Sequence, residues 1–294
     1  MKRTDRGLLL RIVAIGATAV LVFAACSEDK EPTDDGNGDG AQFELVSEGV
    51  LSVGSDYPYP PFEFEDESGT LTGFDVELVR AIADELGLEN TDDAWQSVNF
   101  DTIFQQLATN TKFDIVIAAV TAYAAPGSDA ETVVKDRRAQ VDFTVAYYDS
   151  LQSLTVDTDT NPDVASVDDL PDGARVGVQQ ATTGAFYAEE NLTGVELVGF
   201  AKAPLMYQQL QAGQLDAVFN DLPVSLDAIK DTPELQVVEQ VETGEQYGIA
   251  VSKDNPELLK AIDDALQTLF DNGTYAEIFA KYFPDQELPA YASE

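Results

Sequence analysis

Short β-branched runs alternate with stretches of helical periodicity along most of this 294-residue chain. Residues 50–54 and 114–120 have the composition of buried strands, and between them apolar side chains recur at helical spacing from Phe74 to Leu86. A strand that is apolar on both sides needs cover on both of its faces. The alternation therefore predicts an α/β fold, in which helices cover a sheet from both sides.

The same kind of unit recurs in the second half of the chain, where strand-like and helix-like segments again alternate. Two amphipathic segments separated by Asn272 and Gly273 then predict a helical tail. The sequence thus predicts two α/β units, with seams near residues 145–150 and 243–248. The segments that carry this prediction are residues 101–108, 175–178, 195–200, 203–211, 215–219, 256–270 and 274–282.

Cys26 is the only cysteine, and it follows a segment with the features of a secretory signal. Four basic residues precede an apolar run over residues 12–25, and two alanines stand directly before the cysteine. This arrangement resembles a bacterial lipobox, in which the cysteine thiol takes a lipid, although Phe23 stands where leucine is usual. An uncut signal anchor is the alternative, but the run is short for a membrane span. We expect a lipid anchor on the outer face of the cell membrane.

Residues 27–40 contain no large apolar side chain and are expected to form a flexible acidic tether. Asp35, Asn37 and Asp39 match the first half of a calcium-loop pattern. Val46, however, stands where the closing acidic ligand should fall, so the tether interpretation is favoured.

Charge and composition exclude several functions. The chain has 16 Lys and Arg against 54 Asp and Glu, a net charge of −38, which disfavours nucleic acid and anionic lipid as partners. The lack of histidine excludes Ser-His catalysis and imidazole metal ligands, so we expect neither a metal nor a cofactor. The acidity fits either a saline habitat or a generally acidic proteome.

One stretch, Gly-Phe-Asp-Val-Glu-Leu at residues 73–78, has the form of a family signature. Five further stretches accompany it in order along the chain, at residues 59–64, 137–144, 213–218, 246–251 and 271–275. Together they resemble the bacterial extracellular solute-binding proteins of family 3, the polar amino-acid type, over about residues 50–283. The resemblance implies a two-lobed, type II periplasmic-binding-protein-like fold, with two crossover strands and the C-terminal helical tail.

The resemblance also implies how the chain divides. It predicts a signal peptide at residues 1–25, the lipidated cysteine with its tether at residues 26–42, a first lobe and a second lobe. The first lobe is expected at residues 43–148 plus 244–294, and the second at residues 149–243.

A free amino acid presents a carboxylate, an ammonium group and a side chain, and the resemblance supplies a partner for each. Arg137 is expected to bind the carboxylate through its planar fork of donors, with its neighbour Arg138 as the alternative. Residues 124–134 form an apparent insertion before it. Asp221, which follows a predicted strand, is expected to bind the ammonium group.

The remaining contacts also follow from the resemblance. Thr182 and Thr183 are expected to bind the carboxylate from the second lobe, although helix capping is an equally good role for one of them. Thr121 and the carbonyl of Ala119 complete the first lobe. The aromatic candidates for stacking on the ligand side chain are Tyr59 and Phe100, and Asp56 is a candidate partner for a basic side chain.

The function that the resemblance implies is that of the extracytoplasmic binding component of an amino-acid ABC importer. We expect a monomer that holds an amino acid, docks on a membrane permease and is not an enzyme. The alternative is a cleft enzyme of the same fold, such as a cyclohexadienyl dehydratase, which uses carboxylates. A sensor ectodomain is a third possibility, but no signalling segment is seen.

Overall fold

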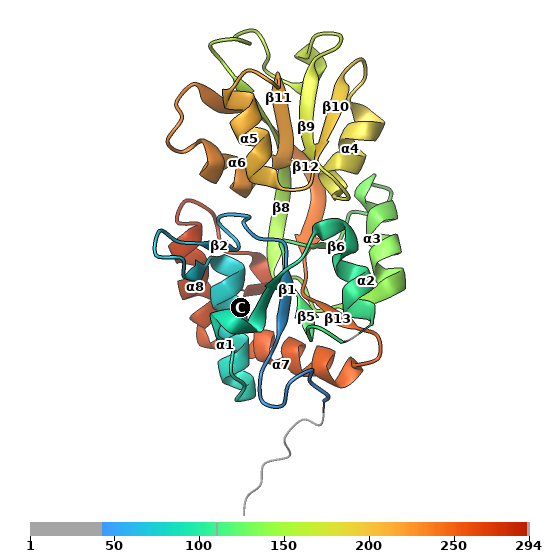
Figure 1. Ribbon diagram of the computed structural model, residues 1–294, viewed down its shortest axis with the longest axis vertical. Helices are drawn as coiled ribbons and strands as arrows, with labels where there is room; N and C mark the ends of the chain where they lie inside the picture. Colours follow the sequence, from blue (N-terminus) through green and yellow to red (C-terminus); the bar gives the residue numbers. More distant parts are fainter. Residues whose placement is uncertain (1–42, 110, 293–294) are drawn as a thin grey trace, which may run out of the picture. The chain divides into compact units, whose positions relative to one another are not determined.

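The computed structural model describes residues 43–109 and 111–292, so Cys26, the calcium-like stretch and the tether lie outside the described residues. No helix within the described ranges is both long enough and apolar enough to cross a membrane. The strands form two larger sheets and a two-stranded ribbon, and each larger sheet is the centre of one lobe (Figure 1).

The predicted strands and helices are present, and the structure adds elements that the sequence pattern did not mark, such as α3 (Ala130–Gln140) and α6 (Leu222–Ile229). The strands are β1 (Val53–Ser55), β2 (Phe64–Glu65), β3 (Leu71–Thr72), β4 (Trp95–Ser97), β5 (Ile115–Val116), β6 (Thr121–Tyr123), β7 (Val141–Phe143), β8 (Tyr148–Asp157), β9 (Arg175–Gln179), β10 (Glu196–Phe200), β11 (Ala217–Asp221), β12 (Leu235–Tyr247) and β13 (Ala250–Ser252). The helices are α1 (Phe74–Leu86), α2 (Ile103–Ala108), α3 (Ala130–Gln140), α4 (Thr183–Asn191), α5 (Ala203–Gln211), α6 (Leu222–Ile229), α7 (Pro256–Asn272) and α8 (Thr274–Tyr282).

The sheet of the first lobe has the order β4-β1-β5-β13-β7. β1 runs parallel to β4 and β5, while β13 is antiparallel to β5 and β7. Successive residues of β5 face opposite sides: Ile115 joins the apolar cluster of α1, α7 and α8, and Val116 joins that of α2. Both faces are therefore covered, as the apolar strand pattern predicts.

The sheet of the second lobe has the order β10-β9-β11-β8-β12-β6. β9, β10 and β11 are parallel, whereas β8 and β12 pair antiparallel with their neighbours. β8 and β12 are long and run from one lobe into the other (Figure 1), so we call them the hinge strands. The sequence pattern marked only a seam at each of them and did not reveal β12 as a strand.

The proline-rich loop over residues 56–62 is anchored against α1. Gly73 precedes this helix with a positive φ of 131°, and a Cβ there would stand 2.0 Å from the carbonyl oxygen of Phe62. Only glycine allows so close a backbone approach. The rings of Phe62 and Phe74 then pack edge to face at 6.2 Å. This packing fixes where the loop presents its side chains.

One segment differs from the sequence-based expectation. The strand expected over residues 114–120 is paired only at Ile115–Val116. Beyond it Ala119 adopts a positive φ of 47° and donates its N–H to the Asp75 carboxylate at 3.0 Å, so its backbone leaves the ladder. The apparent insertion at residues 124–134 forms a loop and the first turn of α3.

Candidate functional site

A cavity lies between the lobes, where the carboxyl ends of β1, β5, β9 and β11 meet. This edge is where open α/β sheets present their ligand sites. Its free space is about 20 Å³, room for about one or two water molecules, so a larger molecule enters only as lobes or side chains move. All the predicted ligand-binding residues line it, joined by Glu63, Ala118 and Gln179.

Arg137 reaches the cavity from α3 and is 4% exposed. Its guanidinium carbon lies 5.2 Å from the ring centre of Phe100 and 5.4 Å from that of Phe104. It donates to the carbonyls of Thr121 at 2.8 Å and Ala181 at 3.4 Å. Burial lowers its pKa to about 10, so it stays charged at neutral pH. Because a guanidinium has five N–H donors, donors remain for an anion.

Arg138 points elsewhere. Its guanidinium lies over the ring of Tyr123 at 4.4 Å and donates to the carbonyl of Ala122 at 3.0 Å. It does not line the cavity. Of the two adjacent arginines, only Arg137 is therefore placed to meet a molecule between the lobes.

Asp221 ends β11 on the second lobe and accepts three hydrogen bonds. The donors are the hydroxyls of Tyr59 and Tyr247, each at 2.7 Å, and the amide of Gln152 at 2.6 Å. Burial, helped by the negative charge of Glu245, raises the pKa of Asp221 to about 6. The carboxylate is thus ionised at neutral pH and held in place by neutral donors. Tyr59 belongs to the first lobe, so this contact also joins the lobes.

The three threonines have different roles. Thr182 caps α4: its hydroxyl accepts from the N–H of Ala185 at 3.0 Å and donates to the carbonyl of Gln179 at 2.8 Å. Thr121 and Thr183 instead each donate to the same carboxylate oxygen of Glu245, at 2.6 Å. Glu245, from β12, was not among the predicted residues.

Asp56 has internal partners. The ammonium group of Lys202, from the second lobe, forms an ion pair with it, and the amide of Gln179 donates to its other oxygen at 2.8 Å. Lys202 also donates to the carbonyl of Tyr57 at 3.1 Å. Burial raises the pKa of Asp56 to about 6, and Lys202 opposes that rise. The carboxylate expected to meet a basic ligand thus already faces a cation of the protein.

Glu63 is fully buried, and neither of its carboxyl oxygens has a hydrogen-bond partner. Burial and the nearby carboxyl of Asp75 raise the pKa of Glu63 well above its ordinary value. Asp75 itself accepts from Tyr147 at 3.0 Å and from Ala119, and burial raises its pKa to about 7. Burial thus favours the protonated form of Glu63, which lines the cavity.

The residues that sequence reasoning missed are Glu63, Gln152, Gln179, Lys202, Tyr247 and Glu245. Gln179 directly follows the strand predicted at residues 175–178, and Glu63 stands in a matched stretch, so both carried a signal. The only sequence signal for Lys202 was the rarity of basic residues in this chain, and no local pattern indicated Glu245.

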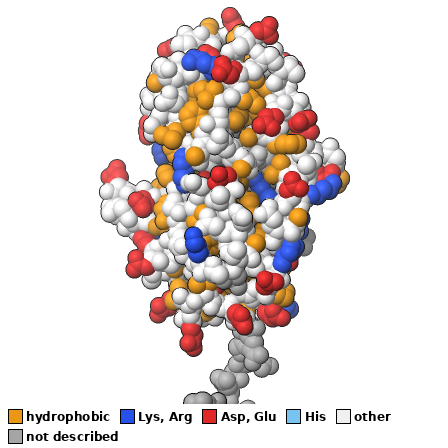
Figure 2. Space-filling view, turned by 45° about the vertical axis from the view of Figure 1, so that its right-hand side comes forward, with side chains coloured by type: hydrophobic (Ala, Val, Ile, Leu, Met, Phe, Trp, Pro, Cys, Tyr) orange, Lys and Arg blue, Asp and Glu red, His pale blue; other side chains and the backbone are white. Residues whose placement is uncertain are grey.

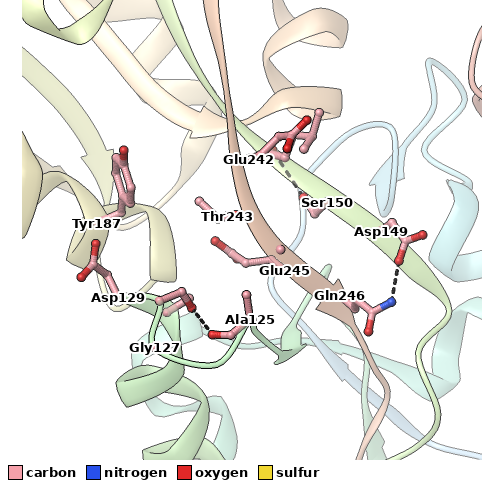
Figure 3. A pocket seen from close by; sticks show the side chains of 14 residues that line it. Ala125, Gly127, Asp129, Asp149, Ser150, Tyr187, Glu242, Thr243, Glu245 and Gln246 are labelled. Atoms are coloured by element: carbon pink, nitrogen blue, oxygen red, sulfur yellow. Dashed lines mark hydrogen bonds between the residues drawn. The ribbon is translucent and has the colours of Figure 1, made fainter.

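A second cavity, of about 600 Å³, lies at the hinge strands (Figure 3). We call it the hinge pocket. Its walls are residues 125 and 127–130 of the first lobe, Tyr187 of α4, residues 149–151 of β8 and residues 242–246 of β12. Within the described ranges, no group of three or more His, Cys, Asp or Glu side chains is arranged to hold a metal ion.

The two lobes, the hinge strands between them and the polar interlobe cavity together define a solute-binding protein. Residues 51–285 match the family model of bacterial extracellular solute-binding proteins, family 3. The chain belongs to this family, and it therefore acts outside the cytoplasm as a binding protein.

Named relatives agree with this assignment. The L-cystine-binding protein TcyJ of Escherichia coli (strain K12) is 30% identical over 274 residues, with 93% of this chain and 95% of the relative covered. An ancestral arginine-binding protein bound to glutamine is 35% identical at a TM-score of 0.72, with 81% of this chain and all of that chain covered. An ancestral amino-acid-binding precursor of cyclohexadienyl dehydratase is 32% identical at a TM-score of 0.68, with coverages of 80% and 96%. All three are binding proteins rather than enzymes.

Proposed function

We propose that this protein is the binding component of an amino-acid ABC importer and closes its lobes on one free amino acid. The observation that carries the proposal is that a buried cation, Arg137, and a buried anion, Asp221, line one cavity from opposite lobes. At neutral pH a free amino acid carries one carboxylate and one ammonium group. A single molecule therefore matches both charges.

The charges also explain why the ligand favours closure. Each charge-assisted hydrogen bond contributes about 1.5–3 kcal/mol net. Arg137 lies on the first lobe and Asp221 on the second, so a ligand makes both contacts fully only when the lobes approach. A ligand with such differential contacts shifts the population toward the closed form.

The other predicted residues keep their proposed roles around this pair. Thr121 and Thr183 would donate to the ligand carboxylate, which requires that they turn away from Glu245. Ala119 offers its carbonyl to the ammonium group. Thr182 contributes backbone N–H groups of the α4 terminus rather than its hydroxyl, which caps the helix. The side walls are Tyr59 and Phe100.

We further propose that the ligand side chain is polar and uncharged. Lys202 pairs with Asp56, and the raised pKa of Glu63 favours its uncharged form, so an uncharged ligand side chain suits this part of the cavity. Gln179 and Glu63 offer hydrogen-bonding groups there. A carboxamide side chain would meet these groups without leaving an unpaired buried charge. Glutamine is the natural first probe.

The test is a calorimetric titration of the protein and two matched variants with the common amino acids. Arg137→Ala should abolish binding while circular dichroism shows an intact fold. Arg138→Ala removes an adjacent arginine that does not line the cavity, and it should bind as the parent does. Equal affinity in Arg137→Ala and the parent would refute the assignment, and no binding of any amino acid to the parent would refute the function.

We also propose that Cys26 carries a lipid that tethers the protein beside its permease. The support is the run of basic, apolar and small residues before the cysteine. Mass spectrometry of the protein from its own membranes should find a diacylglyceryl group on Cys26. Cys26→Ala should lack this group, and a parent protein whose Cys26 carries no lipid would contradict the anchor.

A further inference from the structure

The hinge pocket is far roomier than the interlobe cavity, and both lobes contribute to its walls. Its free volume is about 600 Å³, and it is bounded by the loop before α3, by α4 and by both hinge strands. Because these walls belong to different lobes, the size of the pocket changes with the angle between them. A molecule bound there would favour the interlobe angle that fits it best.

The lining of the hinge pocket is strongly acidic. Asp129, Asp149, Glu242 and Glu245 contribute carboxyl groups, and no lysine or arginine is among its lining residues. Two of these groups have neutral partners: Asn191 donates to Asp129 at 2.7 Å and Gln246 donates to Asp149 at 2.7 Å. The pocket therefore has a surplus of acceptors.

Two buried polar side chains in this pocket have no partner for one of their oxygen atoms. Glu245 is 1% exposed, and the oxygen that does not face the threonines accepts no hydrogen bond. Thr243 is 7% exposed, and its hydroxyl is equally unpartnered. Both side chains lie on the same side of β12, towards the space between Tyr187 and the 125–129 loop (Figure 3). Buried polar groups nearly always have partners, so these two atoms point to a ligand.

We propose that the hinge pocket binds a small organic cation with two or more amine groups, such as an aliphatic diamine. An amine cation supplies N–H donors, which the Glu245 carboxylate and the Thr243 hydroxyl oxygen both accept. The remaining carboxylates are spread over both walls, so a second amine group at a distance from the first also meets an anion. Among residues 43–109 and 111–292, no group of three or more His, Cys, Asp or Glu side chains is arranged to hold a metal ion, and this favours an organic cation as the ligand.

Glu245 couples this pocket to the interlobe cavity. Its second oxygen accepts the hydroxyls of Thr121, from the first lobe, and Thr183, from the second. A cation that pulls the carboxylate towards the hinge pocket weakens these bonds and frees both hydroxyls for an amino acid carboxylate. Diamine binding should therefore strengthen amino-acid binding, and by linkage the reverse must hold to the same factor.

The test titrates the protein with 1,4-diaminobutane at low ionic strength. One molecule should bind, and both Glu245→Gln and Thr243→Val should weaken it, the former by about tenfold or more. Thr243→Val keeps the proposal testable if Glu245→Gln does not fold. Glu257→Gln, which removes one exposed acid at the start of α7, is the charge-matched control and should bind unchanged.

Three results would overturn the inference. The first is no saturable binding to the parent. The second is equal weakening by Glu257→Gln, which would indicate general attraction to an acidic surface. The third is loss of binding in Asp221→Asn but not in Glu245→Gln. The last result would place the diamine in the interlobe cavity. None of the three bears on whether an amino acid binds there, so the proposed function stands or falls separately.

Discussion

Lys202 and Asp56 form an ion pair that joins the two lobes across 146 residues of chain. The carboxylate side chain is 3% exposed and the lysine side chain 24% exposed, so the pair is largely shielded from water. The protein thus contributes its own cation at the position where a basic ligand side chain was expected. The pair also stabilises the approach of the lobes.

Replacement of that cation should change ligand preference. In Lys202→Met the buried Asp56 has only Gln179 as a partner, so a cationic ligand side chain gains a vacant anion. We expect affinity for arginine, relative to glutamine, to rise by about tenfold or more. Calorimetric titration of both amino acids against parent and variant measures this ratio.

Lys230→Met is the matched control, because Lys230 pairs with Asp227 on α6 and its side chain is 62% exposed. It should leave the ratio unchanged. Tighter binding of arginine than of glutamine by the parent protein would contradict the proposed ligand class, although an amino acid would still be the ligand.

Asp221→Asn should remove the partner of the ligand ammonium group. The amide can keep the position of the carboxylate but not its charge, so we expect affinity to fall by about 2 kcal/mol or more. Thermal stability should hold or increase, because burial already penalises the charged form of Asp221. Asp227→Asn, on the neighbouring helix, is the control. Unchanged affinity in Asp221→Asn would show that another residue binds the ligand ammonium group.

Stability should rise as the pH falls from about 7.5 to about 5. Burial raises the pKa of Asp56 and Asp221 to about 6 and that of Asp75 to about 7, whereas the unfolded chain keeps the ordinary value of 3.8. In this window the folded protein binds more protons than the unfolded chain, so protonation favours folding. The destabilising effect of these groups is largest above their folded pKa values, declines as the pH falls below them, and is lost only below the ordinary value of 3.8.

Melting temperatures measured across that pH range test this prediction. Asp75→Asn removes the group with the highest of these values and should flatten the curve near pH 7. A melting temperature that stays level or drops between pH 7.5 and 5.5 would show that other groups control the pH dependence.

Salt should stabilise the protein. Acidic side chains lie at many places on the face shown in Figure 2. A net charge of −38 makes the folded chain repel itself, and dissolved ions screen that repulsion over about 10 Å at 0.1 M salt. We expect the melting temperature to rise from low to molar sodium chloride. Equal stability at both ends of the series would remove the argument for a saline habitat and favour a generally acidic proteome.

Much of the fold could be predicted from local patterns. The helical spacing from Phe74 to Leu86 and the apolar run near Ile115 reproduce α1 and β5, because side-chain periodicity reports directly which faces are buried. β12 was missed because its residues alternate imperfectly and are interrupted by two irregular steps in its pairing with β8. The strand predicted at residues 114–120 is too long, because the backbone turns at Ala119 towards Asp75. That turn depends on a partner 44 residues away in the chain, which a local pattern does not reveal.

The sequence by itself determined the alternation of strands and helices, and its resemblance to a family singled out Arg137 and Asp221 as candidate ligand-binding residues. Only the tertiary structure decided which polar groups meet: Asp56 with Lys202, and Glu245 with Thr121 and Thr183. The physical reason is that such contacts join residues far apart in the chain. Packing and the exclusion of water from the interior select the partner of each polar group. The spacing of neighbouring residues in the sequence does not reveal either effect.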